Sequence, residues 1–160
     1  MSELRIMGVE ITLNDDPELS GCGLTIFCCG CPHACPGCHT PDSWIPENGK
    51  LTPIKDLKKK IEDSLPLIKY VCFCGGEFLL YRKALIELAD WCKTLKLKTI
   101  LFTGYDYHAI SEDVRETIDV IVDGKYREDL KQTKFPASTN QRVFIKGVPV
   151  DSLTLPINQL

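Results

Sequence analysis

Several features are scarce or absent in this sequence of 160 residues. No apolar run reaches the roughly 18 residues that a membrane-spanning helix needs, so we expect no contact with a membrane. The first ten residues hold no apolar core followed by a cleavage site, so we also expect no signal peptide. These absences predict a cytoplasmic protein, in a compartment where thiols stay reduced.

An excess of positive charge is also missing. The chain has 19 Lys and Arg against 22 Asp and Glu, a formal net charge of −3, which argues against binding nucleic acid through a broad basic surface. We find no repeat and no linker, and the length predicts a single domain over residues 1–160. A closed barrel of eight βα units needs about 200 residues or more, so the chain has room for a partial barrel only.

Cysteine, by contrast, is abundant. The chain has nine cysteines, and six of them fall between Cys22 and Cys38. An odd number of clustered cysteines disfavours the disulfide framework of a secreted protein. Clustered thiols in a reducing compartment instead indicate a metal site, and Cys31, Cys35 and Cys38 form the spacing C-x3-C-x2-C.

Three cysteines on one loop suit an iron–sulfur cluster, because thiolates are soft, anionic ligands. They can bind three irons of a [4Fe–4S] cluster and leave the fourth open, as catalysis requires. A zinc knuckle usually has two C-x2-C pairs, and a ferredoxin-type carrier has C-x2-C-x2-C with a fourth cysteine. Free structural thiols are a third alternative, but the whole pattern favours the three-cysteine cluster.

The other six cysteines are open to two interpretations. Cysteine often packs as a small buried apolar residue, and this interpretation is favoured over ligation of a second cluster. One of the six lies on the apolar side of an expected helix, where packing is the simpler explanation. The six are Cys22, Cys28, Cys29, Cys72, Cys74 and, on that helix, Cys92.

Hydrophobic periodicity predicts strands that alternate with helices. This order indicates an α/β fold built from parallel βαβ units, in which chemistry gathers where the strands end. Two segments, 30–53 and 126–139, are expected to be irregular loops with functional roles. Strands are expected at 5–12, 24–28, 70–74, 99–102, 120–122 and 143–145, and helices at 54–64, 82–94 and 111–117.

The cysteine loop resembles that of the radical S-adenosylmethionine (SAM) superfamily. The next expected strand ends in Cys74-Gly75-Gly76-Glu77, as the resemblance requires. The closer likeness is to the activating proteins of anaerobic (class III) ribonucleotide reductases, and it spans about residues 20–145. It is carried by Gly30-Cys31-Pro32-His33-Ala34-Cys35-Pro36-Gly37-Cys38-His39, Trp44, Thr103-Gly104-Tyr105, Val122-Asp123-Gly124-Lys125-Tyr126, Asp129-Leu130 and Ser138-Thr139-Asn140-Gln141. The chain departs from the family pattern at Cys22, Cys74 and Phe78, where proline, serine and proline are usual.

The resemblance implies a partial (β/α) barrel of the radical SAM type, open on one side. It implies a [4Fe–4S] cluster on Cys31, Cys35 and Cys38 and SAM as the second cofactor, with no catalytic side chain beyond the cluster. Glu77 is implied to accept a hydrogen bond from the SAM ammonium group. Lys125 follows a strand that ends at the expected pocket, where it would pair with the SAM carboxylate or hold the substrate loop. The residues implied to contact SAM are Gly75, Gly76, Glu77, His39 through its backbone, Asp123, Lys125 and Thr103.

The implied reaction is reductive cleavage of SAM, followed by hydrogen abstraction from a glycine of the reductase catalytic subunit. The electron would come from a donor such as flavodoxin or ferredoxin. The reductase would dock on a rim formed by the cysteine loop, Trp44, Tyr105 and residues 126–139. Two alternatives stay open: a radical SAM enzyme acting on a small heterocycle, similar to a carboxy-deazaguanine synthase, and a non-enzymatic carrier with Cys22, Cys28 or Cys29 as fourth ligand.

Overall fold

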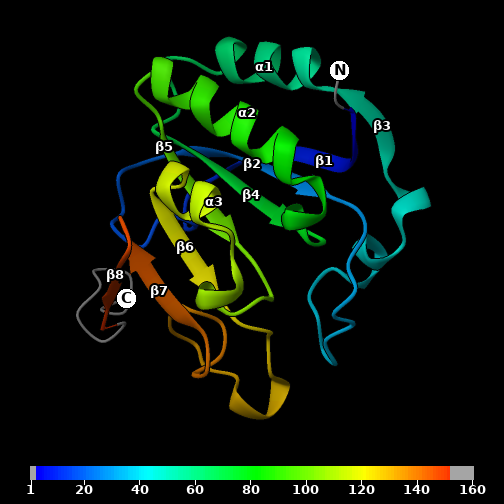
Figure 1. Ribbon diagram of the computed structural model, residues 1–160, viewed down its shortest axis with the longest axis vertical. Helices are drawn as coiled ribbons and strands as arrows, with labels where there is room; N and C mark the ends of the chain where they lie inside the picture. Colours follow the sequence, from blue (N-terminus) through cyan, green and yellow to red (C-terminus); the bar gives the residue numbers. More distant parts are fainter. Residues whose placement is uncertain (1–2, 152–160) are drawn as a thin grey trace.

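The fold is mixed α/β, with one open eight-stranded sheet in a computed structural model that describes residues 3–151 (Figure 1). The order across the sheet is β3-β1-β2-β4-β5-β6-β7-β8, so β3 and β8 form its two edges. The strands are β1 (Glu3–Thr12), β2 (Gly23–Cys28), β3 (Lys50–Pro53), β4 (Tyr70–Gly75), β5 (Lys98–Phe102), β6 (Val120–Asp123), β7 (Arg142–Ile145) and β8 (Val148–Val150).

The four central strands β2, β4, β5 and β6 are parallel, which confirms the predicted βαβ order. The flanking strands are antiparallel: β1 pairs with β2 and β3, and β7 pairs with β6 and β8. Neither β3 nor β8 was expected from the sequence. Both are short edge strands with largely exposed residues, so only their pairing with β1 and β7 identifies them.

Helices cover one face of the sheet, and the larger of two hydrophobic clusters lies between these helices and the sheet. The helices are α1 (Ile54–Asp63), α2 (Arg82–Thr94) and α3 (Glu112–Thr117), close to the predicted ranges. Their apolar side chains pack on the alternate strand residues that face them, such as Phe73 and Leu101. The buried helix residues are Ile54, Leu57, Ile61, Ala84, Leu85, Leu88, Ala89, Cys92 and Val114.

A second, smaller apolar cluster occupies the opposite face of the sheet. It contains Tyr70, Cys72, Ile100, Val120, Val122 and Val143, all buried. Loops rather than helices cover this face, and the ring of Phe135 meets that of Phe102 edge to face, 5.9 Å between centroids. Because the central strands are buried on both faces, their sequences are continuous apolar runs instead of alternating patterns.

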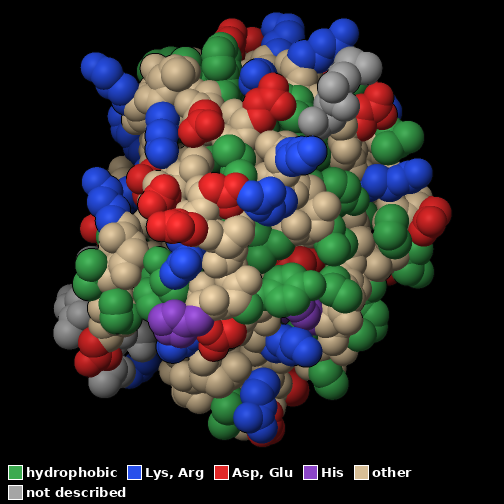
Figure 2. All heavy atoms as spheres, in the orientation of Figure 1, with side chains coloured by type: hydrophobic (Ala, Val, Ile, Leu, Met, Phe, Trp, Pro, Cys, Tyr) green, Lys and Arg blue, Asp and Glu red, His purple; other side chains and the backbone are tan. Residues whose placement is uncertain are grey.

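The outer surface of the helical layer is charged. The run Lys58-Lys59-Lys60 lies on α1, where Lys58 pairs with Glu87 and Lys59 with Asp63. On the face shown in Figure 2, basic and acidic side chains are interspersed. Within residues 3–151, no helix is long and apolar enough to cross a bilayer.

A buried ion pair fastens the turn after β1 to the start of β5. The Asp16 side chain is buried and accepts hydrogen bonds from the Glu18 and Ser20 amides and from Lys98 Nζ, at 2.9, 3.1 and 2.9 Å. Burial alone would raise the pKa of Asp16, but the hydrogen bonds from Ser20, Glu18 and Lys98 outweigh it and hold that pKa below its ordinary value. A lowered carboxylate pKa stabilises the fold above about pH 4, and this contribution is lost as the pH falls.

We therefore expect Asp16→Asn to lower the free energy of unfolding at pH 7 by about 1.5–3 kcal/mol. The difference in the free energy of unfolding between parent and variant should shrink as the pH falls toward the lowered pKa of Asp16, because the parent then loses its ionised carboxylate. Urea unfolding at pH 7 and pH 3 measures both effects. Glu18→Gln is the matched control: Glu18 also pairs with Lys98 but its side chain is 46% exposed, so it should cost less than about 1 kcal/mol. Equal losses for the two variants would contradict this assignment.

Candidate functional site

Most of the predicted site residues meet around one cavity at the carboxyl ends of the central strands. The cavity has a volume of about 120 Å³. Because β4, β5 and β6 are parallel, the turns that follow them lie at the same edge of the sheet, and the cysteine loop reaches this edge from β2. Seven predicted residues line the cavity: Cys31, Cys35, Cys38, Gly75, Gly76, Thr103 and Lys125.

The three loop cysteines are free, partly buried thiols surrounded by amide donors. Backbone N–H groups of His33 and Ala34 donate to Cys31, that of Tyr126 donates to Cys35, and that of Thr40 lies 3.5 Å from the sulfur of Cys38. Desolvation by burial raises the pKa of the Cys31 and Cys35 thiols, so ligation must displace their protons.

Such a donor set fits a cluster better than a single ion. In the part of the chain that the structure describes, no three Cys, His, Asp or Glu side chains converge on one metal position. The three thiols instead border a shared cavity, and their N–H···S contacts are of the kind that tunes iron–sulfur centres. The residues present therefore fit a [4Fe–4S] cluster.

The glycine turn after β4 is pressed against the start of the cysteine loop. Gly75 has a φ of +98°, and a Cβ there would lie 2.6 Å from the backbone N and O of Cys28. A Cβ on Gly76 would lie 2.4 Å from the carbonyl oxygen of Gly30. The amides of Gly76 and Glu77 donate to the carbonyls of Cys28 and Gly30, at 2.8 and 2.7 Å. Only glycine fits at both positions, and the turn exposes backbone to the cavity.

Glu77 lies behind the cavity wall instead of within it. Its side chain is fully buried, and Oε1 accepts from Thr103 Oγ1 at 2.8 Å and from the Gly104 amide at 2.9 Å. The same oxygen lies 2.8 Å from His33 Nε2, and Oε2 accepts from the Leu79 amide at 3.1 Å. Both Glu77 oxygens accept hydrogen bonds from the protein, and the contact with SAM that the resemblance implies stays a prediction. The Glu77 side chain joins three segments of the protein.

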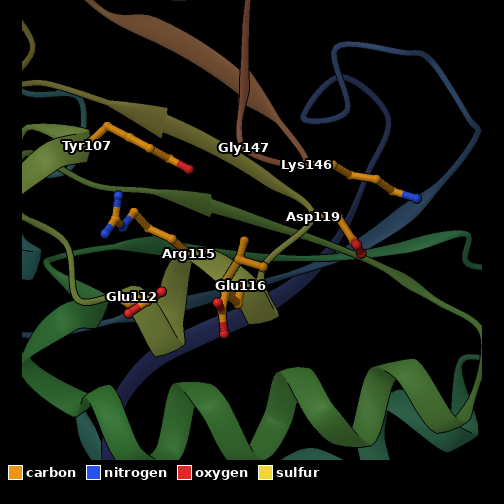
Figure 3. A pocket seen from close by; sticks show the side chains of 8 residues that line it. Tyr107, Glu112, Arg115, Glu116, Asp119, Lys146 and Gly147 are labelled. Atoms are coloured by element: carbon orange, nitrogen blue, oxygen red, sulfur yellow. The ribbon is translucent and has the colours of Figure 1, made fainter.

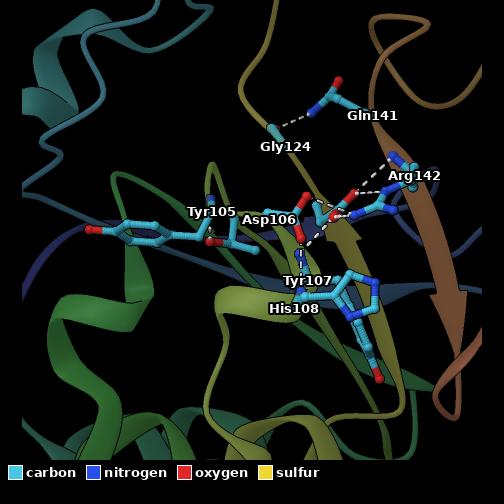
Figure 4. A network of polar contacts seen from close by, with 9 residues as sticks. Tyr105, Asp106, Tyr107, His108, Gly124, Gln141 and Arg142 are labelled. Atoms are coloured by element: carbon cyan, nitrogen blue, oxygen red, sulfur yellow. Dashed lines mark hydrogen bonds and ion pairs between the residues drawn. The ribbon is translucent and has the colours of Figure 1, made fainter.

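Asp123, whose partners Tyr107 and Arg142 are labelled in Figure 4, is likewise a buried structural carboxylate. It accepts from the Tyr107 amide at 2.7 Å, from the Arg142 amide at 3.1 Å and from Arg142 Nη2 at 2.6 Å. Arg142 also reaches Asp106, 3.0 Å away. Asp123 thus fixes the end of β6 to β7 and to the loop after β5, and it leaves the next residues, Gly124 and Lys125, at the cavity.

His39 and Trp44 stand beside the cavity without lining it. The His39 ring packs on Tyr126, 5.2 Å between centroids, so any contact with SAM is left to its main chain. The carbonyl of Trp44 accepts a hydrogen bond from the Cys31 amide at 3.2 Å. Trp44 therefore anchors the loop that carries the thiols.

Several residues that were not predicted to contact the cluster or SAM also line the cavity. His33, Gly104, Tyr126 and Gln141 lie within the quoted motifs, which was the available signal, while Phe102 and Cys74 end their strands. Desolvation by burial raises the pKa of Cys74 to about 12, so its thiol is protonated at neutral pH. Four other cysteines are fully buried, as the packing interpretation expects: Cys28, Cys29, Cys72 and Cys92.

A larger cavity, of about 510 Å³, lies at the other end of β6 (Figure 3). It contains both acidic and basic side chains, among them Glu112, Arg115 and Lys146. No predicted cluster or SAM residue lines it. The predicted cluster and SAM residues that line a cavity therefore all line the smaller one.

Comparison with known proteins agrees with this geometry. Residues 19–144 match the model of the family described as a 4Fe-4S single cluster domain. The anaerobic ribonucleoside-triphosphate reductase-activating protein of Enterobacteria phage T4 is 33% identical over 133 residues, which cover 78% of this chain and 84% of that protein. The chain belongs to the radical SAM activating enzymes.

Two further relatives support the assignment of the chain to the radical SAM activating enzymes. The pyruvate formate-lyase-activating enzyme of Clostridium pasteurianum is 34% identical over 131 residues, 78% of this chain, although the match spans only about half of that enzyme, 54%. The Escherichia coli (strain K12) anaerobic ribonucleoside-triphosphate reductase-activating protein is 28% identical over 141 residues, covering 77% of this chain and 88% of that protein. The cofactors of the activating enzyme are accordingly a [4Fe–4S] cluster and SAM.

Proposed function

We propose that this radical SAM activating enzyme generates a glycyl radical on an anaerobic ribonucleoside-triphosphate reductase. The observation that carries the proposal is the convergence of three free thiols, Cys31, Cys35 and Cys38, with the Gly75-Gly76 turn around one cavity. The relatives named for activation of that reductase support the choice of substrate, because the matches span 84% and 88% of their lengths.

Within this proposal the thiolates of Cys31, Cys35 and Cys38 would hold the cluster, and three protein ligands would leave one iron for SAM. When bound, the reduced cluster and SAM supply a 5′-deoxyadenosyl radical and methionine, the chemistry that the protein itself lacks. The backbone of Gly75 and Gly76 borders the SAM position, with Thr103 beside it, and Lys125 provides a cation for the SAM carboxylate. The main chain of His39 would contact the adenine. Glu77 and Asp123 support these residues from behind the cavity wall.

The open sheet suits a protein substrate. We interpret it as the partial (β/α) barrel of the radical SAM type, formed by residues 1–160 as one domain. Within the described residues the sheet stays open between its edge strands β3 and β8, so it does not close around a small metabolite. A glycine-bearing loop of the reductase can instead enter from the rim, where the Tyr105 side chain is 37% exposed. The electron donor would be a cytoplasmic flavodoxin or ferredoxin.

The test is to mix the reconstituted enzyme anaerobically with the reductase from the same organism, SAM and a chemical reductant. We expect the EPR doublet of a glycyl radical on the reductase, because the radical formed from SAM abstracts hydrogen from a glycine held close to it. Cys35→Ala should give no doublet. A reductase whose radical-bearing glycine is replaced by alanine is the control on the substrate side.

Two outcomes would contradict the proposal. Cleavage of SAM without a glycyl signal, on a reductase competent with another activator, would favour a small heterocyclic substrate. A reduced cluster whose EPR spectrum is unchanged by SAM would favour a non-enzymatic electron carrier, since four cysteine ligands would leave no iron for SAM.

A further inference from the structure

His33 lies between two of the proposed cluster ligands, Cys31 and Cys35, yet its side chain points inward. The side chain is only 6% exposed, and Nε2 lies 2.8 Å from Glu77 Oε1. Its ring meets the ring of Tyr105 edge to face, 4.6 Å between centroids. The hydrogen bond is the one that an Nε2–H of the His33 ring makes to a carboxylate oxygen.

Glu77 Oε1, the oxygen that His33 contacts, also binds residues that directly follow β5. Glu77 Oε1 also accepts from Thr103 Oγ1 and from the Gly104 amide, at 2.8 and 2.9 Å. Glu77 itself follows the glycine turn after β4, and its second oxygen accepts from Leu79. One buried carboxylate therefore connects the cysteine loop, the glycine turn and the end of β5.

Gly104 makes room for this arrangement. A Cβ at position 104 would lie 2.4 Å from His33 Cδ2 and 2.6 Å from Nε2. Gly104 is not among the glycines with a positive φ, so its backbone conformation does not call for glycine. The space occupied by the His33 ring is the reason that a side chain does not fit.

We propose that His33 is a positioning residue, whose hydrogen bond to Glu77 holds the cysteine loop against the strand ends that contact SAM. Residues 31–38 form neither helix nor strand, so single contacts fix where the cysteines lie, among them the Cys31 amide on the Trp44 carbonyl and the His33 side chain on Glu77. A displacement of about 1 Å between reacting groups is enough to reduce rates severely. This inference rests on the proposed function, because it concerns the same cluster and SAM site.

The first test compares His33→Leu with His33→Gln in the reconstituted holoenzyme. A glutamine side chain places an amide donor where Nε2 stands, whereas leucine has none. We expect His33→Leu to retain iron but to bind SAM about tenfold or more weakly, as followed by the SAM-dependent change in the EPR spectrum. The cluster midpoint potential should shift in His33→Leu, and His33→Gln should restore both quantities toward the parent.

The second test changes the space beside the His33 ring through Gly104. Gly104→Ala should displace the ring and reproduce the His33→Leu defect, while Gly8→Ala should behave as the parent, since nothing lies within 4 Å of a Cβ at position 8. In the double variant His33→Ala/Gly104→Ala, the space is already vacated. Its defect should therefore be no larger than that of His33→Ala alone, a non-additivity expected of residues in contact.

The outcomes separate this inference from the function on which it rests. If the parent shows no SAM-dependent spectral change, the proposed function fails. If the parent responds and His33→Leu binds SAM equally well at an unchanged potential, the positioning role is overturned. If His33→Leu does not fold, Gly104→Ala and the double variant decide, because additive defects in that pair would overturn the role and non-additive defects would support it.

Discussion

Replacing any one of Cys31, Cys35 or Cys38 by alanine is expected to abolish the [4Fe–4S] cluster. In the proposed ligand set each thiolate would bind one iron, and Cys74, a further thiol in the cavity wall, is a poor replacement because burial raises its pKa to about 12. Without the cluster, reductive cleavage of SAM and the glycyl signal should both vanish. Iron and sulfide content per chain after anaerobic reconstitution, with the visible absorption of the cluster, measures the effect.

Cys92→Ala is the matched control for this set. Cys92 packs on the core side of α2, fully buried, and does not line the cavity. The variant loses one buried sulfur and should keep its iron. Full iron content and activity in any of the three loop variants would show that the ligand set is wrong, and loss of iron in Cys92→Ala would show that iron content only reports folding.

Asp123→Ala is expected to lower the free energy of unfolding by about 3 kcal/mol. Its carboxylate accepts from the amides of Tyr107 and Arg142 and pairs with the Arg142 guanidinium, so its removal leaves two N–H groups without their acceptor and leaves the guanidinium with its exposed partner Asp106. Urea unfolding followed by circular dichroism measures the loss, which should appear in the midpoint at an unchanged m-value.

Asp63→Ala provides the comparison at the surface. Asp63 pairs with Lys59 one helical turn away on α1, and both side chains are more than 60% exposed. Its removal should cost only about 0.3–0.5 kcal/mol. If Asp123→Ala were as mild as this variant, the contacts of Asp123 with Tyr107 and Arg142, which Figure 4 labels, would not hold β6 and β7 together as described. Because Gly124 and Lys125 follow directly, Asp123→Ala should also weaken SAM binding.

Much of the fold could be predicted from the sequence, and the limits have a physical cause. The parallel strands at 24–28, 70–74, 99–102 and 120–122 are continuous apolar runs because both of their faces are buried. The helices follow from the spacing of their core residues. The edge strands β3 and β8 have no such pattern, since their residues are largely exposed and only pairing with β1 and β7 makes them strands.

The sequence by itself determined the proposed ligand set, because Cys31, Cys35 and Cys38 lie within eight residues and their spacing is a local property of one loop. Tertiary structure alone decided which motif residues face the cavity. Glu77 belongs to a recognisable turn, but its partners His33 and Gly104 are 44 and 27 residues away. Asp123 is turned toward Arg142, 19 residues on, while its neighbour Lys125 reaches the cavity. A motif fixes where a side chain stands along the chain, but contacts between distant segments fix the direction in which it points.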